Sequence, residues 1–411
     1  MNAVGSQAVL LAMSTGVSQL GIAAIFVFAA RGTDPASLGI VASAMALGVT
    51  LAGLVDFGSN AFWVREIARG VMSLAELGQK LVSKLIIGSG VAGLVTVVLA
   101  ALGPPSLLWA AGPLGLATLI GQSAQTPLRG AALGHIASLA VVFDRFVAVL
   151  AYFTLTSLGV PEASALVGAL VAGPIASAFL AAFLTPSKDA PDYRRFRFRS
   201  PWDRAGNFGI SAGFLSLQNM DVTILGAVAG SLSAGIYGAV NKWVQPVTIL
   251  AGAFASASAP FIARAGTVRD SWNILRHAVW MPVIAVLVAC SLALSAPWLV
   301  EALLGDEYRD AAKVLTVLAV AAVPGVLNQP LFIALQYLGS DRPVAIVLSA
   351  SIVLQLVLVA ALAPALGALS CAVAILAAQL LQLTAFVILT VHEVRRTGRV
   401  STTPHVGDTT V

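Results

Sequence analysis

Apolar runs of about 20 residues recur along the whole chain, and short polar segments separate them. An α-helix of that length crosses the hydrocarbon core of a bilayer, which is about 30 Å thick. The pattern therefore predicts twelve membrane-spanning helices. Their predicted ranges are 7–30, 37–57, 82–102, 107–126, 135–158, 161–184, 206–230, 236–260, 278–300, 311–335, 344–363 and 368–391.

The composition favours a membrane protein over a soluble one. Hydrophobic residues make up 58% of the 411 residues and charged residues 10%, against about 25% charged residues in an average soluble domain. A soluble fold of this length could not bury so much apolar surface. We therefore predict an all-α polytopic membrane protein.

The longest polar interruption, TPSKDAPDYRRFRFRSPWDRA at 185–205, divides the predicted spans into two groups of six. We predict an N-terminal lobe at 1–184, a basic cytoplasmic linker at 185–205, a C-terminal lobe at 206–391 and a cytoplasmic tail at 392–411. Short matches relate the two groups: Gly39 and Gly235 open the second span of each, and Pro127 and Pro330 lie in the fourth. An even number of spans per group is compatible with parallel repeats.

The basic residues predict the orientation in the membrane. With both termini inside, the cytoplasmic segments hold 18 of the 23 Lys and Arg residues. Among them we count Lys80 and also Lys84, which lies at the start of the third predicted range, as residues of a cytoplasmic loop. Outer loops hold Arg31, Arg309 and Lys313. By the positive-inside rule, both termini are expected in the cytoplasm. We expect the membrane to be the plasma membrane. Because these charges lie in loops, the net charge of +5 does not indicate a nucleic-acid partner.

Several short motifs carry a family resemblance. They are ASLGIV at 36–41, VDFG at 55–58, VREIAR at 64–69, DVTILG at 221–226, AGIYG at 234–238 and LGDEY at 304–308. Through them the chain resembles the Wzx-type polysaccharide flippases of the multidrug, oligosaccharidyl-lipid and polysaccharide exporter superfamily. The resemblance follows the order of spans over nearly the whole chain, although each motif is short and degenerate.

The resemblance implies two six-helix lobes around a hydrated central cavity that opens alternately to the two sides of the membrane. It implies a lipid-linked oligosaccharide as cargo, carried on polyprenyl pyrophosphate for cell-surface polysaccharide biosynthesis. A polysaccharide polymerase and glycosyltransferases would then be partners. Related branches export drugs or the peptidoglycan precursor, so a cation-coupled drug antiporter remains the alternative. The branch that exports the peptidoglycan precursor usually has two additional C-terminal spans, which are not among the twelve predicted here.

Four ionisable residues stand out at mid-membrane depth within the predicted spans: Asp144, Arg145, Asp221 and Lys242. A charge at the centre of a membrane helix costs about 2.5–3.5 kcal/mol, so such residues usually face a cavity or a partner. Arg145 and Lys242 could attract the anionic head of the cargo. Alternatively, Arg145 could form an ion pair with Asp144 or Asp221 that only joins helices, and Lys242 could extend to the interface.

The two carboxylates leave another choice open. Asp144 and Asp221 could couple transport to H⁺ or Na⁺, or they could serve only as partners of the cations. No cofactor and no metal is expected.

Neutral polar residues within the spans suggest a hydrated wall. Amide side chains both donate and accept hydrogen bonds, as sugar recognition requires, although they also bridge helices in any membrane bundle. The candidates for substrate binding are Gln125, Gln218, Asn241, Gln245 and Gln329. The basic stretch 64–84 could form one surface helix or a helical hairpin. The four histidines are scattered, and we do not expect an enzyme.

Overall fold

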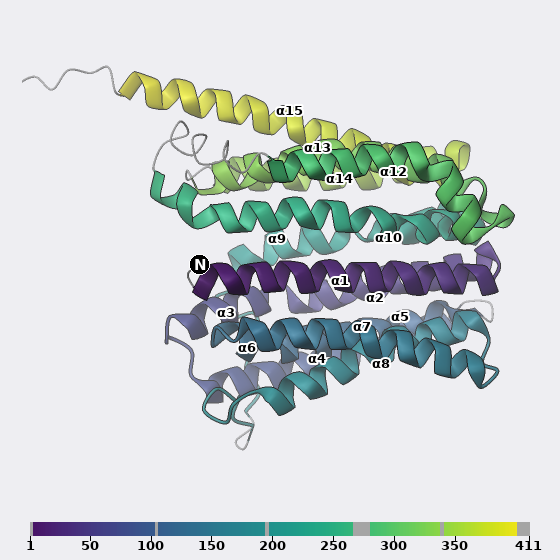
Figure 1. Cartoon of the computed structure of the whole chain (residues 1–411). Coiled ribbons are helices and arrows are strands. Elements are labelled where there is room, and N and C mark those ends of the chain that lie inside the picture. The colour runs from purple at the N-terminus through teal and green to yellow at the C-terminus, as the bar shows by residue number, and fades with distance from the viewer. Residues whose placement is uncertain (1–2, 103–105, 194–196, 266–279, 338–340, 401–411) are drawn as a thin grey trace, which may run out of the picture.

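The computed structural model describes residues 3–102, 106–193, 197–265, 280–337 and 341–400, and every regular element within these residues is a helix (Figure 1). The α-helices are α1 (Ala3–Gly32), α2 (Pro35–Asp56), α3 (Ser59–Ala68), α4 (Leu74–Leu102), α5 (Ala111–Ala124), α6 (Thr126–Gly130), α7 (Gly134–Ser157), α8 (Glu162–Leu184), α9 (Gly206–Leu217), α10 (Met220–Ala265), α12 (Trp280–Leu304), α13 (Ala311–Tyr337), α14 (Asp341–Leu366) and α15 (Leu369–Val400). Two 3₁₀ turns, Leu107–Ala110 and Asp306–Tyr308, precede α5 and α13.

The predicted spans coincide with helices of this structure, which confirms the all-α membrane fold. Ten helical segments in the described part of the chain are long and apolar enough to cross a bilayer, and a shorter apolar segment covers Gly16–Gly32 of α1. Helix α10 holds the end of the seventh predicted span and the eighth, with non-helical backbone at Gly230 (φ 84°, ψ 164°) between them. The stretch 64–84 is not one surface helix, because α3 ends at Ala68 and α4 begins at Leu74.

The seventh predicted span is interrupted between α9 and α10. The side-chain amide of Asn219 donates to the carbonyl oxygen of Ser216 (3.2 Å), to which the Asn219 backbone N–H also donates (3.2 Å). An asparagine side chain that bonds its own backbone competes with regular helix, so Gln218 and Asn219 form a turn inside the span. This turn lies directly before Asp221.

Helices of the N-terminal half and helices of the C-terminal half form two side-by-side groups, which meet along α2 and α10 (Figure 1). A Cβ atom placed on Gly39 would lie 2.6 Å from the Gly235 nitrogen, and one placed on Gly235 would lie 3.1 Å from the Gly39 nitrogen. Gly39 also meets Ser231, and Gly235 meets Pro35. Contacts that are reciprocal in this way are characteristic of a two-fold axis. The glycines matched in the sequence therefore contact each other across the two halves.

Three hydrogen bonds, donated by Arg31 at the end of α1 and by Tyr308 of the second 3₁₀ turn, join the halves at the same end. The Arg31 guanidinium donates to the carbonyl oxygens of Ala302 (2.6 Å) and Leu303 (2.7 Å). The last carbonyls of a helix have no N–H donor within the helix, and α12 ends at Leu304. The Tyr308 hydroxyl donates to the Thr33 carbonyl oxygen (3.3 Å). Together with the glycine contact, these bonds close the two halves against each other at this end.

The basic segment between the halves is packed against the N-terminal half. The Asp192 N–H donates to the Leu74 carbonyl oxygen (3.2 Å), and the Arg199 N–H donates to Ser83 Oγ (3.0 Å). Further along, Trp202 Nε1 donates to the carbonyl oxygen of Val55 (2.8 Å). The segment therefore crosses the first turns of α4 on its way to α9.

The sequence predicted Lys84 as a residue of a cytoplasmic loop, and this prediction is wrong. Lys84 belongs to α4, and its side chain is fully buried. Its Nζ donates to Asp56 Oδ1 (2.8 Å), Ser59 Oγ (3.2 Å) and Asn60 Oδ1 (2.6 Å), and lies 4.2 Å from the centre of the Trp63 ring. All three ammonium hydrogens thus have an acceptor, which offsets the cost of burying the charge. The network holds α3 against α2 and α4.

Candidate functional site

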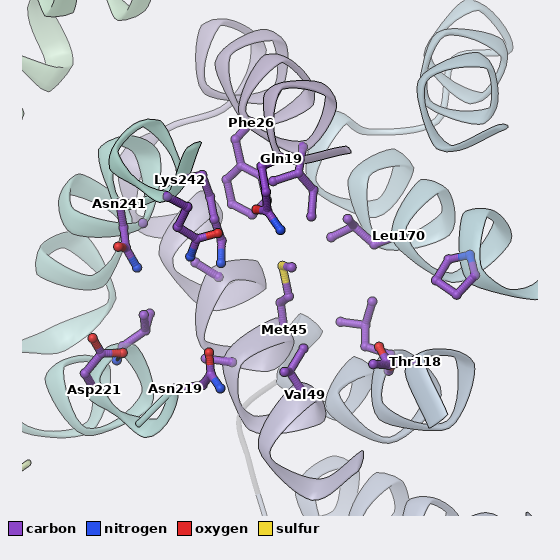
Figure 2. Close-up of a pocket in the computed structure, with 18 of the residues that line it drawn as sticks. Gln19, Phe26, Met45, Val49, Thr118, Leu170, Asn219, Asp221, Asn241 and Lys242 are labelled. Atoms are coloured by element: carbon purple, nitrogen blue, oxygen red, sulfur yellow. Dashed lines mark hydrogen bonds between the residues drawn. The ribbon is translucent and has the colours of Figure 1, made fainter. Parts of the chain in front are cut away.

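A cavity of about 280 Å³ lies between helices of the N-terminal half and α10. Figure 2 shows Gln19 and Phe26 of α1, Met45 and Val49 of α2, Thr118 of α5 and Leu170 of α8 on one part of its wall. Asn219, Asp221, Asn241 and Lys242 form the part contributed by the C-terminal half. We call this space the central cavity. Its wall is apolar toward α2 and α8 and polar toward α10.

Arg145 projects from α7 into the central cavity and is paired with its neighbour. Its Nη2 lies 3.1 Å from Asp144 Oδ2, and its Nε donates to Ser18 Oγ of α1 (2.9 Å). The structure thus pairs Arg145 with Asp144 and shows no ion pair with Asp221 among the described residues. The second carboxylate oxygen, Asp144 Oδ1, is buried and has no hydrogen-bond partner within the described residues.

Lys242 contributes the second cation of the central cavity, from α10. It interacts electrostatically with Asp221 and Arg145. Nevertheless, it forms no ion pair within 4.0 Å in the part of the chain that the structure describes. Lys242 is a half-buried residue, and no described carboxylate contacts it directly. One cation of the cavity comes from each half of the chain.

Asp221 is buried, and hydrogen bonds surround its carboxylate. The Tyr237 hydroxyl donates to Oδ2 (2.7 Å) and the Val222 N–H to Oδ1 (2.7 Å). The Gln355 amide of α14 approaches Oδ2 at 3.5 Å and accepts from the Gln218 amide (3.3 Å). Helices α10 and α14, which are distant in sequence, thus meet at one carboxylate.

A second cavity, of about 260 Å³, lies within the C-terminal half beside α13, α14 and α15. Gln218, Tyr237, Gln355 and Gln379 line it. Its wall also includes four residues that line the central cavity, Asn219, Asp221, Asn241 and Gln245. The polar side of α10 therefore separates two cavities and faces both.

The structure brings most of the sequence-predicted polar residues to these cavities but not all. Asn241 and Gln245 line both, and Gln218 lines only the second. Gln125 lines neither, and its amide oxygen accepts from the Arg129 guanidinium (2.9 Å) where α5 meets α6. Gln329 also lies outside both cavities, on α13.

Four residues of this region were not selected from the sequence: Gln19, Asn219, Tyr237 and Gln355. Gln355 is a lone amide within the eleventh predicted span, and that isolation was a usable signal. Tyr237 carried none, because a tyrosine in a membrane helix is compatible with an interfacial position. Gln19 has a buried amide oxygen without a partner in the described residues, which only the structure can show.

No protein-family model and no curated protein sequence matches this chain. Several solved structures, however, are similar to the structure of this chain. A multidrug resistance MATE family transporter of the MOP superfamily, in an inward-facing conformation, superposes with a TM-score of 0.70 at 16% identity, over 97% of this chain and 99% of the other. The chain has the fold of MOP-superfamily transporters.

Two other solved structures with this fold belong to transporters of different kinds. The lipid II flippase MurJ, in an inward closed conformation, matches with a TM-score of 0.67 at 11% identity, over 96% of this chain and 93% of MurJ. A MOP superfamily transporter from Pyrococcus furiosus, described as having a binding pocket of reverse polarity, matches at 0.59 and 16% identity over 97% of both chains. A multidrug resistance transporter and a lipid II flippase thus share this architecture, so the fold leaves the substrate open.

Proposed function

We propose that the protein flips a lipid-linked oligosaccharide, a glycan on polyprenyl pyrophosphate, across the plasma membrane by alternating access. The observation that carries this proposal is the pair of cations in the central cavity, Arg145 from one half and Lys242 from the other. A pyrophosphate needs fixed positive charge where water is scarce. Two cations from different halves could hold one anionic head between them.

The hydrogen-bond inventory of the cavity supports an anionic, sugar-bearing head. Arg145 uses its Nε–H and one Nη2–H in the bonds described above, which leaves three of its five N–H donors for a ligand. Lys242 keeps three donors. The amides of Gln19, Asn219 and Asn241 supply both donors and acceptors, which sugar hydroxyls require. The polyprenyl tail would stay in the lipid, and the polymerase and glycosyltransferases of a polysaccharide pathway would be partners.

The alternative, a cation-coupled drug antiporter, is favoured by a different part of the same cavity. Phe26, Met45 and Leu170 form an apolar wall that could receive a flat hydrophobic drug. A cationic drug would also need a free carboxylate. Asp221, the carboxylate on the cavity wall, already accepts hydrogen bonds from Tyr237 and Val222.

Asp221 is better suited to coupling than to holding the cargo. Its carboxylate faces both cavities, and carboxylate oxygens can bind a proton or Na⁺. We propose that H⁺ or Na⁺ binds at Asp221. The unpartnered oxygen of Asp144 makes that residue a second candidate.

The experiment compares two substrates in proteoliposomes. Lys242→Met removes the charge and keeps the length of the side chain, and Lys313→Met is the matched control because Lys313 is exposed outside the cavity. Flipping of a fluorescent lipid-linked oligosaccharide should fall at least about tenfold in Lys242→Met, which corresponds to losing one charge-assisted contact. Export of a cationic dye should not fall. If the dye is exported and the oligosaccharide is never flipped by the wild type, the antiporter alternative holds instead.

A double-mutant cycle decides whether Arg145 binds the cargo or only joins helices. Arg145→Ala, Asp144→Asn and the double variant are compared at matched protein levels. If Arg145 contacts the cargo, the double variant stays inactive. Normal transport by the double variant would show that the Arg145–Asp144 pair is structural.

A further inference from the structure

An apolar pocket of about 220 Å³ lies outside both transport cavities, between α4 and α8. Both helices pack against α5, but no extensive contact joins α4 to α8. The end of α5 is therefore left uncovered between them. The helical residues on the pocket wall are mostly apolar and include Leu81, Val82, Leu85, Ile120, Pro127 and Ala182, together with Ser123 of α5. We call this space the α4–α8 pocket.

The surface beside the α4–α8 pocket is strongly apolar. Phe179 and Phe183 of α8 are 73% and 85% exposed, and Ile86 of α4 is 52% exposed. Ala182 of the pocket wall is exposed and lies on the same side of α8 as Phe179, three residues away. Large exposed apolar side chains on membrane-spanning helices face lipid chains, because water would disfavour them. The pocket therefore opens toward the hydrocarbon of the bilayer.

The basic segment between the halves covers the other side of the pocket. Ala190, Pro191 and Tyr193 line it, and the flanking backbone is bonded to α4 through Asp192 and Arg199. The segment 185–205 contains six basic and three acidic residues, so its net charge is +3.

Two basic residues of this segment are available to a ligand. Lys188 and Arg197 are exposed and form no ion pair within the part of the chain that the structure describes, whereas Arg199 lies 3.5 Å from Glu76. Tyr193 and Phe198, which are 57% and 59% exposed, lie beside these charges in the sequence. Exposed aromatic and basic residues in alternation are typical of segments at the membrane–water interface, where they meet anionic lipid.

We propose that the α4–α8 pocket binds one acyl chain of an anionic phospholipid from the surrounding bilayer, with the lipid phosphate beside Lys188 and Arg197. The apolar walls and the lipid-facing mouth fit the chain, and the uncompensated charge of the segment fits the phosphate. This lipid would be a bound neighbour and not the transported cargo, because the pocket shares no lining residue with the central cavity.

Native mass spectrometry of the purified protein tests this site. The protein is incubated with phosphatidylglycerol and phosphatidylcholine of the same acyl chains, and the retained lipid is counted. The wild type should retain phosphatidylglycerol preferentially. In the double variant Lys188→Gln/Arg197→Gln the preference should fall roughly 25-fold, since each basic residue near an anionic surface contributes about fivefold. The control Arg309→Gln/Lys313→Gln, which changes two exposed basic residues elsewhere, should retain it.

A second pair of variants tests the apolar part. Ala182→Trp fills the pocket from its mouth and should abolish retention of both lipids, whereas Ala100→Trp places the same side chain on an exposed position near the other end of α4. Water-soluble glycerophosphoglycerol should not displace the bound lipid. The proposal is overturned if Ala182→Trp retains phosphatidylglycerol like the wild type. It is equally overturned if the folded Lys188→Gln/Arg197→Gln protein, judged by its melting temperature, keeps the full preference.

Discussion

The contact between α2 and α10 at Gly39 and Gly235 leaves no room for a side chain. A Cβ atom on Gly39 would lie 2.6 Å from the Gly235 nitrogen, whereas ordinary van der Waals contact begins at 3.4 Å. The same atom would also overlap the Ser231 carbonyl oxygen. In Gly39→Ala the two helices must therefore separate by about 1 Å at this point, because neither backbone can move aside alone.

The expected cost follows from overpacking, which typically destabilises by about 1–3 kcal/mol. This cost applies to the conformation in which the halves are closed at this end, and a conformation that is open there avoids it. The equilibrium should therefore shift toward the open conformation by roughly 5- to 150-fold. Gly90→Ala is the matched control, since a Cβ atom there meets nothing within 4 Å.

The assay is the rate at which a thiol at the contact reacts with a maleimide. Ser231→Cys provides the thiol, in a Cys290→Ser background because Cys290 is exposed. Labelling should be faster in Gly39→Ala than in Gly90→Ala, and the melting temperature of Gly39→Ala should be lower. Equal labelling rates and equal melting temperatures in the two variants would show that the helices do not depend on this contact.

Three further outcomes are expected. Lys84→Met should destabilise the protein by about 3–5 kcal/mol, because the carboxylate and amide partners lose a buried ammonium, while Lys313→Met should stay within about 0.5 kcal/mol; thermal unfolding measures both. Asp34 is the N-cap of α2, and hydrogen bonds from the Ser37 side chain and backbone lower its pKa from 3.8. Asp34→Ala should therefore destabilise the protein by about 1 kcal/mol above pH 3.8. This difference between wild type and variant should vanish as the pH falls through the lowered pKa of Asp34. A reporter fused after Val411 should be active in the cytoplasm only, and activity outside the cell would refute the orientation that we propose from the basic residues.

The membrane fold could be predicted from the sequence because its signal is long and repeated. Each span needs about 20 apolar residues, and that requirement is visible without any knowledge of packing. The predicted span boundaries differ from the observed helix ends where a helix continues beyond the lipid. Helix α4 begins at Leu74, ahead of the apolar run, because Lys80 pairs with Glu76 one turn away (3.0 Å) and so continues the helix with charged residues.

Lys84 shows why charge position is harder to predict than span number. In the sequence it lies near the start of an apolar run, beside other basic residues, and is typical of a cytoplasmic loop. Its partners Asp56 and Asn60 lie on α2 and α3, more than twenty positions earlier. A buried ammonium is acceptable only where several acceptors converge, and convergence from separate helices leaves no local pattern.

The candidate site could be predicted in part, because a charge at the centre of a membrane helix is energetically costly and therefore rare. Arg145, Asp221 and Lys242 could be selected on that ground alone. Their pairing could not, since Arg145 had two possible carboxylates and the choice of Asp144 depends on side-chain direction. The spans contain more amide side chains than the cavities use. Gln125 is an example, because its amide oxygen accepts a hydrogen bond from the neighbouring Arg129 and lines neither cavity.

The arrangement of the two cavities determines how the proposed coupling can be separated from cargo binding. Asp221 faces both cavities, so the loss of transport in a variant of that residue cannot be assigned to either role. Gln19 lines only the central cavity, and Gln355 lines only the second while it also approaches the Asp221 carboxylate. A change at Gln355 alters the surroundings of the carboxylate and leaves the cargo wall intact, whereas a change at Gln19 does the reverse. Coupling can therefore be measured at Gln355 and cargo recognition at Gln19, because each of these positions belongs to one cavity.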